Sequence, residues 1–241
     1  MKPHLISVVL PCFNEKGNII PLIHEIQEVL KNHSHEIIVV DDNSPDGTYQ
    51  AVAELNISNV KPILRKIDPS FAKSIRTGIE ESSGSIIVIM DSDFNHEPCY
   101  LPVMIANCQF FDVVSGSRFV YGGSMGSKFR HISSWIFNVL LRVLTRRLIT
   151  DSLFGFIAIR RETLEKVNFD DIFWGYGDYC IRLMYYLQEK SCTILQIPVV
   201  LGKRKYGEGN KKLFRTLLTY LKATLQLVFF SKKEPKLCST K

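Results

Sequence analysis

Five short apolar runs, rich in β-branched residues, are the feature that most restricts what this 241-residue chain can fold into. Each run is continuous rather than alternating, which is typical of strands covered on both faces of a sheet. Segments with apolar residues at helical spacing separate the runs. The predicted strands are 6–10, 36–40, 86–90, 113–115 and 194–201, and the first predicted helices are 18–31, 48–55, 72–82 and 101–106. This alternation predicts an α/β fold with a mixed, mainly parallel central sheet flanked by helices.

Length and composition limit the architecture and the partners. With 46% hydrophobic and 22% charged residues, the chain can bury one sizeable core, so we expect a single domain. The net charge of +6 attracts phosphates, anionic headgroups or nucleic acid without choosing among them. Six scattered cysteines without a CxxC pair predict reduced thiols in a cytosolic compartment, and no export signal is evident.

Polar, mostly acidic residues directly follow four of the predicted strands. They are Asn14 and Glu15, Asp41 and Asp42, Asp91 and Asp93, and Ser117 and Arg118. In open α/β sheets, ligands bind beyond the carboxyl ends of the strands. We therefore expect these four strand ends to form one binding site.

Asp91-Ser92-Asp93 is the segment with the clearest chemical meaning. Because side chains alternate along an extended chain, both carboxylates point the same way and can hold one hard divalent cation. The functional interpretation is Mg²⁺ or Mn²⁺ that bridges a diphosphate. The alternative is a solvated acidic turn, since a DxD motif alone is weakly specific.

The segment 41–48 places three acids in a turn that then starts a helix, with Asp46 or Thr48 available as the cap. A carboxylate of Asp41 or Asp42 can accept hydrogen bonds from a base or a ribose. The alternative is turn formation alone, because Asn, Ser, Pro, Asp and Gly all favour turns. Two adjacent acids at the end of a buried strand repel each other, which favours a bound partner.

Taken together, three segments resemble the family 2 glycosyltransferases with the GT-A (Rossmann-like) fold. They occur in the family's order and approximate spacing: Pro11-Cys12-Phe13-Asn14-Glu15, Asp41-Asp42-Asn43-Ser44 and Asp91-Ser92-Asp93. The resemblance covers roughly residues 5–215.

Four further segments look like those of the dolichol- and polyprenol-phosphate mannosyltransferases. Residues 91–98 look like DADxSHxPE, 116–118 match GSR, 151–156 are similar to D-x-T-S-G-F, and 197–199 with Arg204, Gly207 and Lys211 look like EVPxxFxxRxxGxSK. There are also departures: residues 69–73 replace a glycine-rich GLGxA segment, Phe154 replaces a usual Ser, and 207–211 is one residue longer than GxSK. These differences bear on which sugar donor is used and on how the molecule that accepts the sugar fits, and not on the fold.

The resemblance implies a role for each matched position. Pro11, Asn14, Glu15, Asp41 and Asp42 would hold the nucleoside of a nucleotide sugar, and Asp91 and Asp93 would hold Mg²⁺ or Mn²⁺ and the diphosphate. Arg118, Arg130 and Arg204 would meet phosphate of the donor or the acceptor. Arg204 or Lys211 would help the metal to stabilise the departing diphosphate.

The chemistry of the acceptor determines whether a base is needed. The oxygen of a lipid phosphate is already ionised at neutral pH, so positioning by Arg118 and Arg130 suffices. A sugar hydroxyl requires a carboxylate base, and Asp178 lies near where many relatives carry an acid. The alternative role of Asp178 is to cap the helix 179–189. His96 either assists the metal site indirectly or is incidental.

Two further stretches combine apolar and basic residues at helical spacing. We expect a GT-A domain over 1–215, including an amphipathic helix at about 128–149, followed by a C-terminal amphipathic helix and loose tail over 216–241. Basic residues interrupt both apolar stretches, so neither is expected to span a membrane. Their composition favours an interfacial helix at a lipid surface or contact with a membrane partner subunit. The alternative for 128–147 is a helix that buries its apolar face on the sheet.

These features favour an inverting glycosyltransferase on the cytosolic face of a membrane. We expect it to transfer a hexose, mannose or glucose, from a GDP or UDP sugar to a polyprenyl or dolichyl phosphate. One alternative is a family 2 enzyme that glycosylates a hydroxyl of a cell-surface glycan, and another is a non-catalytic nucleotide-sugar-binding subunit. A dinucleotide dehydrogenase is disfavoured because no GxGxxG follows the first strand. Nucleic-acid binding is disfavoured because the basic residues accompany Leu and Ile rather than stacking aromatics.

Overall fold

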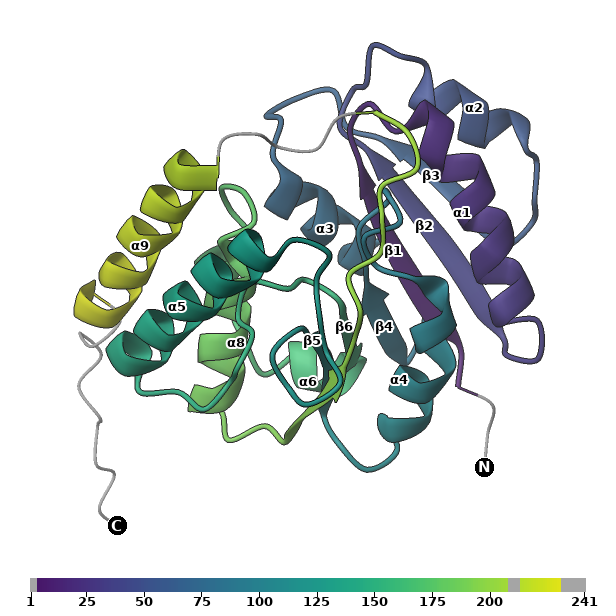
Figure 1. Cartoon of the computed structure of the whole chain (residues 1–241). Coiled ribbons are helices and arrows are strands. Elements are labelled where there is room, and N and C mark those ends of the chain that lie inside the picture. The colour runs from purple at the N-terminus through teal and green to yellow at the C-terminus, as the bar shows by residue number, and fades with distance from the viewer. Residues whose placement is uncertain (1–3, 208–212, 231–241) are drawn as a thin grey trace.

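A seven-stranded sheet forms the centre of the chain (Figure 1). The computed structural model describes residues 4–207 and 213–230. The strands are β1 (Ile6–Cys12), β2 (His35–Asp41), β3 (Val60–Leu64), β4 (Ile86–Ile89), β5 (Val113–Ser117), β6 (Ile157–Arg160) and β7 (Ile194–Pro198). Their order across the sheet is β3-β2-β1-β4-β6-β5-β7. Within the described residues only β6 runs antiparallel to its neighbours, so the expected mixed, mainly parallel sheet is confirmed.

Helices cover both faces of this sheet. The helices are α1 (Lys16–Val29), α2 (Thr48–Glu54), α3 (Phe71–Glu80), the 3₁₀ helix η1 (Pro98–Tyr100), α4 (Leu101–Asn107), α5 (Lys128–Thr145), α6 (Arg161–Leu164), α7 (Phe169–Ile172), α8 (Tyr179–Glu189) and α9 (Leu213–Phe230). Val8 and Leu10 pack into a cluster with α1 and α4, whereas Val9 packs into a second cluster with α3 and α8. Alternate residues of β1 thus enter two separate cores, which explains why its apolar run is continuous.

The helices α5 and α9 lie beside each other, away from the sheet (Figure 1). A third apolar cluster joins them to α8 through Phe137, Leu141, Ile181, Tyr185 and Leu227. The helix α5 therefore packs on other helices and does not cover the sheet. The domain boundary expected after residue 215 falls inside α9. Within the described ranges, no helix combines the length and the apolar character that crossing a bilayer requires.

Two strands of the sheet carry no clear signal in the sequence. β3 contains Lys61 and Pro62, and proline is tolerated there because β3 is the edge strand of the sheet. β6 is only four residues long, which is too short to show a periodic pattern. The predicted strand 194–201 is shorter in the structure, where β7 ends at Pro198.

Candidate active site

A cleft of about 1270 Å³ opens at the edge of the sheet where β1, β2, β4 and β5 end. The segments that line it follow those strands, begin α3 and α5, precede α8, and come from α9 and the chain after β7. Its polar and charged lining residues include Glu15, Asp42, Ser70, Asp91, Asp93, Arg118, Arg130, Arg204, Thr216 and Tyr220. The expected convergence of polar groups on this edge is therefore present.

Hydrogen bonds connect the turn after β1 to the turn after β2. Asn14 adopts a left-handed backbone with φ of 58°, which asparagine tolerates better than most residues. Its backbone N–H donates to the Ser44 Oγ at 2.9 Å. Asp41 in turn accepts hydrogen bonds from the Ser44 backbone N–H at 2.8 Å and from its hydroxyl at 2.5 Å. Asn14 and Asp41 thus shape the turns, and neither is among the residues that line the cleft.

Asp42 does line the cleft, and it is held by two donors. Its Oδ1 accepts from the Arg65 guanidinium at 2.5 Å, and its Oδ2 accepts from the Ser70 backbone N–H at 2.6 Å. Arg65 follows β3, one of the two strands that the sequence analysis did not predict. These contacts hold the segment that begins α3 against Asp42 at the cleft.

Arg204 bridges two acids across the floor of the cleft. Its Nη2 donates to the Glu15 Oε1 at 2.8 Å, and its Nη1 donates to the Asp93 Oδ2 at 3.0 Å. Burial raises the pKa of Glu15, while hydrogen bonds from Asn18 and Arg204 partly oppose that rise. The Asn18 side-chain amide also exchanges two hydrogen bonds with the Tyr206 backbone, at 3.0 and 2.9 Å. The chain after β7 is therefore pinned over the ends of β1 and β4.

Asp91 and Asp93 both line the cleft. Burial raises the pKa of Asp91 to about 6, and the positive charges of Arg118 and Arg204 oppose the rise. Burial also raises the pKa of Asp93, with a further contribution from the charge of Asp91. Asp93 accepts hydrogen bonds from the backbone and side chain of Asn95 at 3.0 and 2.7 Å.

His96 is buried and contacts the turn that contains Asp91 and Asp93. Its Nδ1 accepts the backbone N–H of Asp91 at 2.8 Å, and its Nε2 lies 3.6 Å from the Asp91 Oδ2. Burial lowers the pKa of His96 to about 3, so the imidazole is neutral and its proton resides on Nε2. The ring stacks on Phe156 and meets the edge of Phe154. His96 thus orients the backbone of Asp91.

The donor set at this turn fits a hard divalent cation that is shared with a ligand. Within residues 4–207 and 213–230, no group of three or more His, Cys, Asp or Glu side chains is placed to enclose a metal ion. Two carboxylates leave most coordination positions to water or to phosphate oxygens, and Mg²⁺ is commonly bound in that way. Asp91 and Asp93 are therefore suited to a cation that arrives with a diphosphate.

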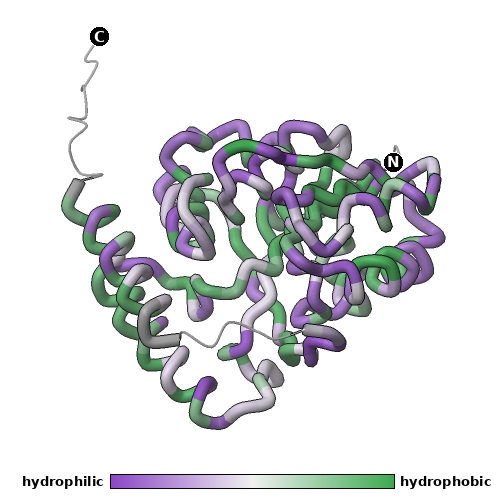
Figure 2. The backbone as a smooth tube through the Cα atoms, turned by 90° about the horizontal axis from the view of Figure 1, so that it is seen from above, coloured by the Kyte–Doolittle hydropathy of each residue, from purple (hydrophilic) through white to green (hydrophobic). Residues whose placement is uncertain are grey.

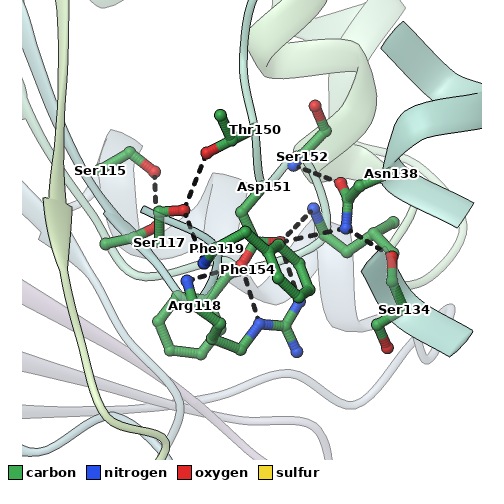
Figure 3. A network of polar contacts seen from close by, with 12 residues as sticks. Ser115, Ser117, Arg118, Phe119, Ser134, Asn138, Thr150, Asp151, Ser152 and Phe154 are labelled. Carbon is green, nitrogen blue, oxygen red and sulfur yellow. Dashed lines mark hydrogen bonds and ion pairs between the residues drawn. The ribbon is translucent and has the colours of Figure 1, made fainter. Parts of the chain in front are cut away.

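Arg118 is fixed by a buried carboxylate (Figure 3). Its Nε and Nη2 donate to the two oxygens of Asp151, each at 2.8 Å. Arg118 lines both the main cleft and an adjoining cavity of about 240 Å³. Arg130 and Ser134 of α5, together with Phe154, line the same smaller cavity. Two arginines from different elements therefore face one small space next to Asp91.

Asp178 lies behind the wall of the cleft and is not among its lining residues. One of its oxygens accepts the Tyr176 backbone N–H at 2.9 Å, and the other is bound by the buried Arg182 guanidinium. It is the N-cap residue of α8, but its side chain makes no capping hydrogen bond. Its partners hold the loop 174–177 in place, and Ser70 binds the Gly175 carbonyl of that loop at 2.7 Å.

Some site residues carried no recognisable sequence signal. Arg65 and Asn18 act on other side chains of the site from positions outside the matched motifs. Thr216 and Tyr220 line the cleft because α9 folds back over it. The sequence analysis predicted this helix, but assigned it to a lipid surface or a partner subunit and not to the cleft. Lys211, expected at the diphosphate, lies outside the described residues.

Comparison with known proteins identifies the family. The profile of glycosyl transferase family 2 matches residues 7–167, which contain the ends of β1, β2, β4 and β5. The chain belongs to glycosyltransferase family 2. The dolichol-phosphate mannosyltransferase of Pyrococcus furiosus is 31% identical over 229 residues, which cover 92% of this chain and 63% of that protein. The enzyme of the same name from Saccharomyces cerevisiae is 27% identical, with 93% and 87% covered.

Among solved structures, glucosyl-3-phosphoglycerate synthase from Mycobacterium tuberculosis, in complex with Mn²⁺, UDP and glucosyl-3-phosphoglycerate, superposes with a TM-score of 0.74. The two chains are 21% identical, and the match covers 93% of this chain and 80% of that one. The expected GT-A fold of this family 2 member is thereby confirmed.

Proposed function

We propose that this family 2 enzyme transfers a hexose, mannose or glucose, from a GDP or UDP sugar to a polyprenyl or dolichyl phosphate, with inversion. The placement of four acids and of two arginines in different parts of the cleft carries the proposal. Within the described part of the chain, the four acids that line the cleft follow β1, β2 and β4. Arg118 and Arg130 instead come from the end of β5 and the start of α5. One end suits a metal-bound diphosphate, and the other suits a second phosphate.

On the donor side, Asp91 and Asp93 would hold Mg²⁺ or Mn²⁺, which when bound neutralises charge on the leaving diphosphate. Arg204 already lies between Glu15 and Asp93, so its guanidinium adds positive charge where the leaving group develops its negative charge. Asp42 lines the cleft beyond Glu15, where a carboxylate accepts hydrogen bonds from a ribose or base.

On the acceptor side, a phosphate oxygen attacks the anomeric carbon from the face opposite the diphosphate. The acceptor oxygen is already ionised, so the task of the protein is to bring two anions together and align them. Arg118 and Arg130 supply charge-assisted hydrogen bonds for that purpose. The names of the relatives, dolichol-phosphate mannosyltransferases, support this choice of acceptor.

The surface of α5 supports a peripheral position on the cytosolic face of a membrane. Its outward side exposes apolar residues alongside Lys128, Arg142 and Arg146, a combination that suits anionic headgroups. The exposed apolar residues of α5 are Phe129, Ile132, Trp135, Ile136, Val139, Leu140 and Val143. A membrane partner subunit is the alternative occupant of this surface.

Release of nucleoside diphosphate tests the proposal. The purified protein would be incubated with GDP-mannose or UDP-glucose, Mn²⁺ and a short polyprenyl phosphate in detergent. We expect release that depends on the lipid phosphate, and a loss of at least about 100-fold in Asp91→Ala and Asp93→Ala. Asp170→Asn, which alters an exposed acid that is not among the residues lining the cleft, is the matched control. Undiminished turnover of both alanine variants in the presence of chelator would contradict the proposal.

Asp178→Asn separates the two kinds of acceptor. If a glycan hydroxyl is the acceptor and Asp178 is its base, this variant loses turnover altogether. If the acceptor is a phosphate, the main effect is on stability, because the buried Arg182 loses its charged partner. Turnover with polyprenyl phosphate, measured on the fraction that is folded by circular dichroism, should then stay within about tenfold of wild type. Binding of nucleotide sugar without turnover on any acceptor would instead favour a non-catalytic subunit.

A further inference from the structure

Asn138 is a polar side chain on the buried side of α5, with 1% of its surface exposed. Two of its three hydrogen bonds leave the helix (Figure 3). Its Oδ1 accepts the Ser152 backbone N–H at 2.8 Å, and its Nδ2 donates to the Asp151 Oδ1 at 3.4 Å and to the Ser134 carbonyl at 3.0 Å. A buried amide needs such partners, and here they connect α5 to the segment that precedes β6.

Asp151 is fully buried, and donors surround its carboxylate. Besides the Arg118 guanidinium, the backbone N–H groups of Arg118 and Leu153 donate to it, at 3.1 and 3.4 Å. Two parallel bonds between a guanidinium and a carboxylate fix the plane as well as the position of the arginine. The rings of Phe119 and Phe154 lie 5.3 and 4.9 Å from the guanidinium carbon, which limits its movement further.

This arrangement leaves one nitrogen of Arg118 for a ligand. Nε and Nη2 are used by Asp151, and within the described residues no hydrogen bond engages Nη1. Arg130 and Ser134 reach the same small cavity from α5 itself. Two elements must therefore keep a fixed relation if both arginines are to contact one phosphate group.

We propose that Asn138 is a positioning residue that couples α5 to Arg118 through Asp151. It sets the distance between Arg130, which moves with α5, and Arg118, which is held by Asp151. The identity of the ligand between them rests on the proposed function. The linkage itself rests on the contacts of Asn138.

Asn138→Asp isolates this linkage because the two side chains have nearly the same shape. The carboxylate still accepts from the Ser152 N–H, but it no longer donates to Asp151 or to the Ser134 carbonyl of its own helix, and it places a like charge beside Asp151. We expect the KM for polyprenyl phosphate to rise about tenfold, as loss of one well-aligned charge-assisted contact would produce, while the KM for the donor stays within about twofold. Asn138→Ala, which adds no charge, should move the same constant in the same direction if Asn138→Asp fails to fold.

Thr145→Val is the matched control on the same helix. Thr145 is half-buried, and its hydroxyl donates only to the Leu141 carbonyl within α5, at 2.7 Å. This variant should leave both KM values unchanged. A parallel rise of both KM values in Asn138→Asp, or an equal effect in Thr145→Val, would reduce Asn138 to a general stabilising residue and overturn the inference.

A spectroscopic readout separates this inference from the proposed function. The Arg118 Nε–H, bonded to Asp151, should give a slowly exchanging ¹⁵N signal, assigned by its absence in Arg118→Lys. We expect the signal to shift or broaden in Asn138→Asp and to remain in Thr145→Val, with no substrate present. An unchanged signal in Asn138→Asp would contradict the inference. A wild-type protein that never uses polyprenyl phosphate would contradict only the proposed acceptor.

Discussion

Asp91 shows how the site is built at the scale of single residues. Burial raises its pKa to about 6, and within the described residues its carboxylate oxygens accept no hydrogen bond. The His96 Nε2 lies 3.6 Å from its Oδ2. Neighbouring acids have partners, since Asp41 binds Ser44, Asp42 binds Arg65 and Asp93 binds Asn95. An acid that the fold leaves without a donor is poised for a ligand.

Asp91→Asn is therefore expected to stabilise the metal-free protein in a pH-dependent way. The folded-state pKa of Asp91 is raised, so ionisation of Asp91 costs the wild type stability as the pH rises through about 6. Above that pH the variant should be more stable by about 1 kcal/mol, a figure lowered for the part of the side chain that water reaches. Below pH about 4 the two proteins should unfold alike. Thermal melts in chelator, from pH 4 to 8, measure the difference, and a variant less stable at pH 8 would contradict it.

At the scale of elements, the close approach of α3 to the sheet positions Ser70 and Phe71 at the rim of the cleft. Gly78 makes that approach possible, because a Cβ placed there would lie 2.3 Å from the Val9 Cγ1 and 3.2 Å from the Val40 Cγ2. Both valines belong to central strands and have little freedom to move.

Gly78→Ala should destabilise the protein although alanine favours helices. Overpacking costs about 1–3 kcal/mol, which exceeds the gain in helix propensity of about 1 kcal/mol. A lower urea midpoint with an unchanged m-value is the expected result. Gly126→Ala is the control, because no atom of the described residues lies within 4 Å of its Cβ position, and it should stay within about 0.5 kcal/mol of wild type. A urea midpoint for Gly78→Ala at or above that of wild type would contradict this, and would show that β1 and β2 shift to accommodate the added methyl group.

At the scale of the whole molecule, two long helices form a body beside the sheet domain. Figure 2 shows α9, which leads to the C-terminal trace, coloured largely as hydrophobic. Because α5 and α9 contact each other and α8, part of this apolar surface is buried in the third cluster. The remainder of α5 faces outward next to the mouth of the cleft, where Arg130 lies. A lipid-linked acceptor would thus meet the site close to its own membrane.

Trp135→Glu should weaken binding to vesicles of phosphatidylcholine and phosphatidylglycerol by about tenfold, because burial of a large apolar side chain contributes about 1.5 kcal/mol or more. Trp135 is 51% exposed on the outer side of α5. Phe110→Glu, which alters a 70% exposed aromatic between α4 and β5, is the control and should bind like wild type. Sedimentation with vesicles measures both. Equal binding of all three proteins would exclude α5 as the lipid-facing surface.

The sequence determined the layered fold and the edge of the sheet at which the site lies. Strand runs such as that of β1 are continuous because both faces of the sheet are covered, and this follows from local composition. Asp42, Asp91, Asp93 and Arg118 come together at the cleft because parallel strands end at one edge, which follows from connectivity. Membership of family 2 glycosyltransferases was likewise visible in the motifs.

Only the tertiary structure determined which of these side chains line the cleft. Asp41 and Asp42 are adjacent in sequence, yet one binds a turn and the other lines the cleft, because successive side chains point to opposite sides. The partner of Asp178 is Arg182 in a buried pair, and Arg118 owes its orientation to Asp151, 33 residues away. Asp178 and Arg182 are only four residues apart, so their spacing is local and only their burial depends on packing. The pairing of Arg118 with Asp151 joins elements that are distant in the sequence, and no local pattern encodes the distance that decides it.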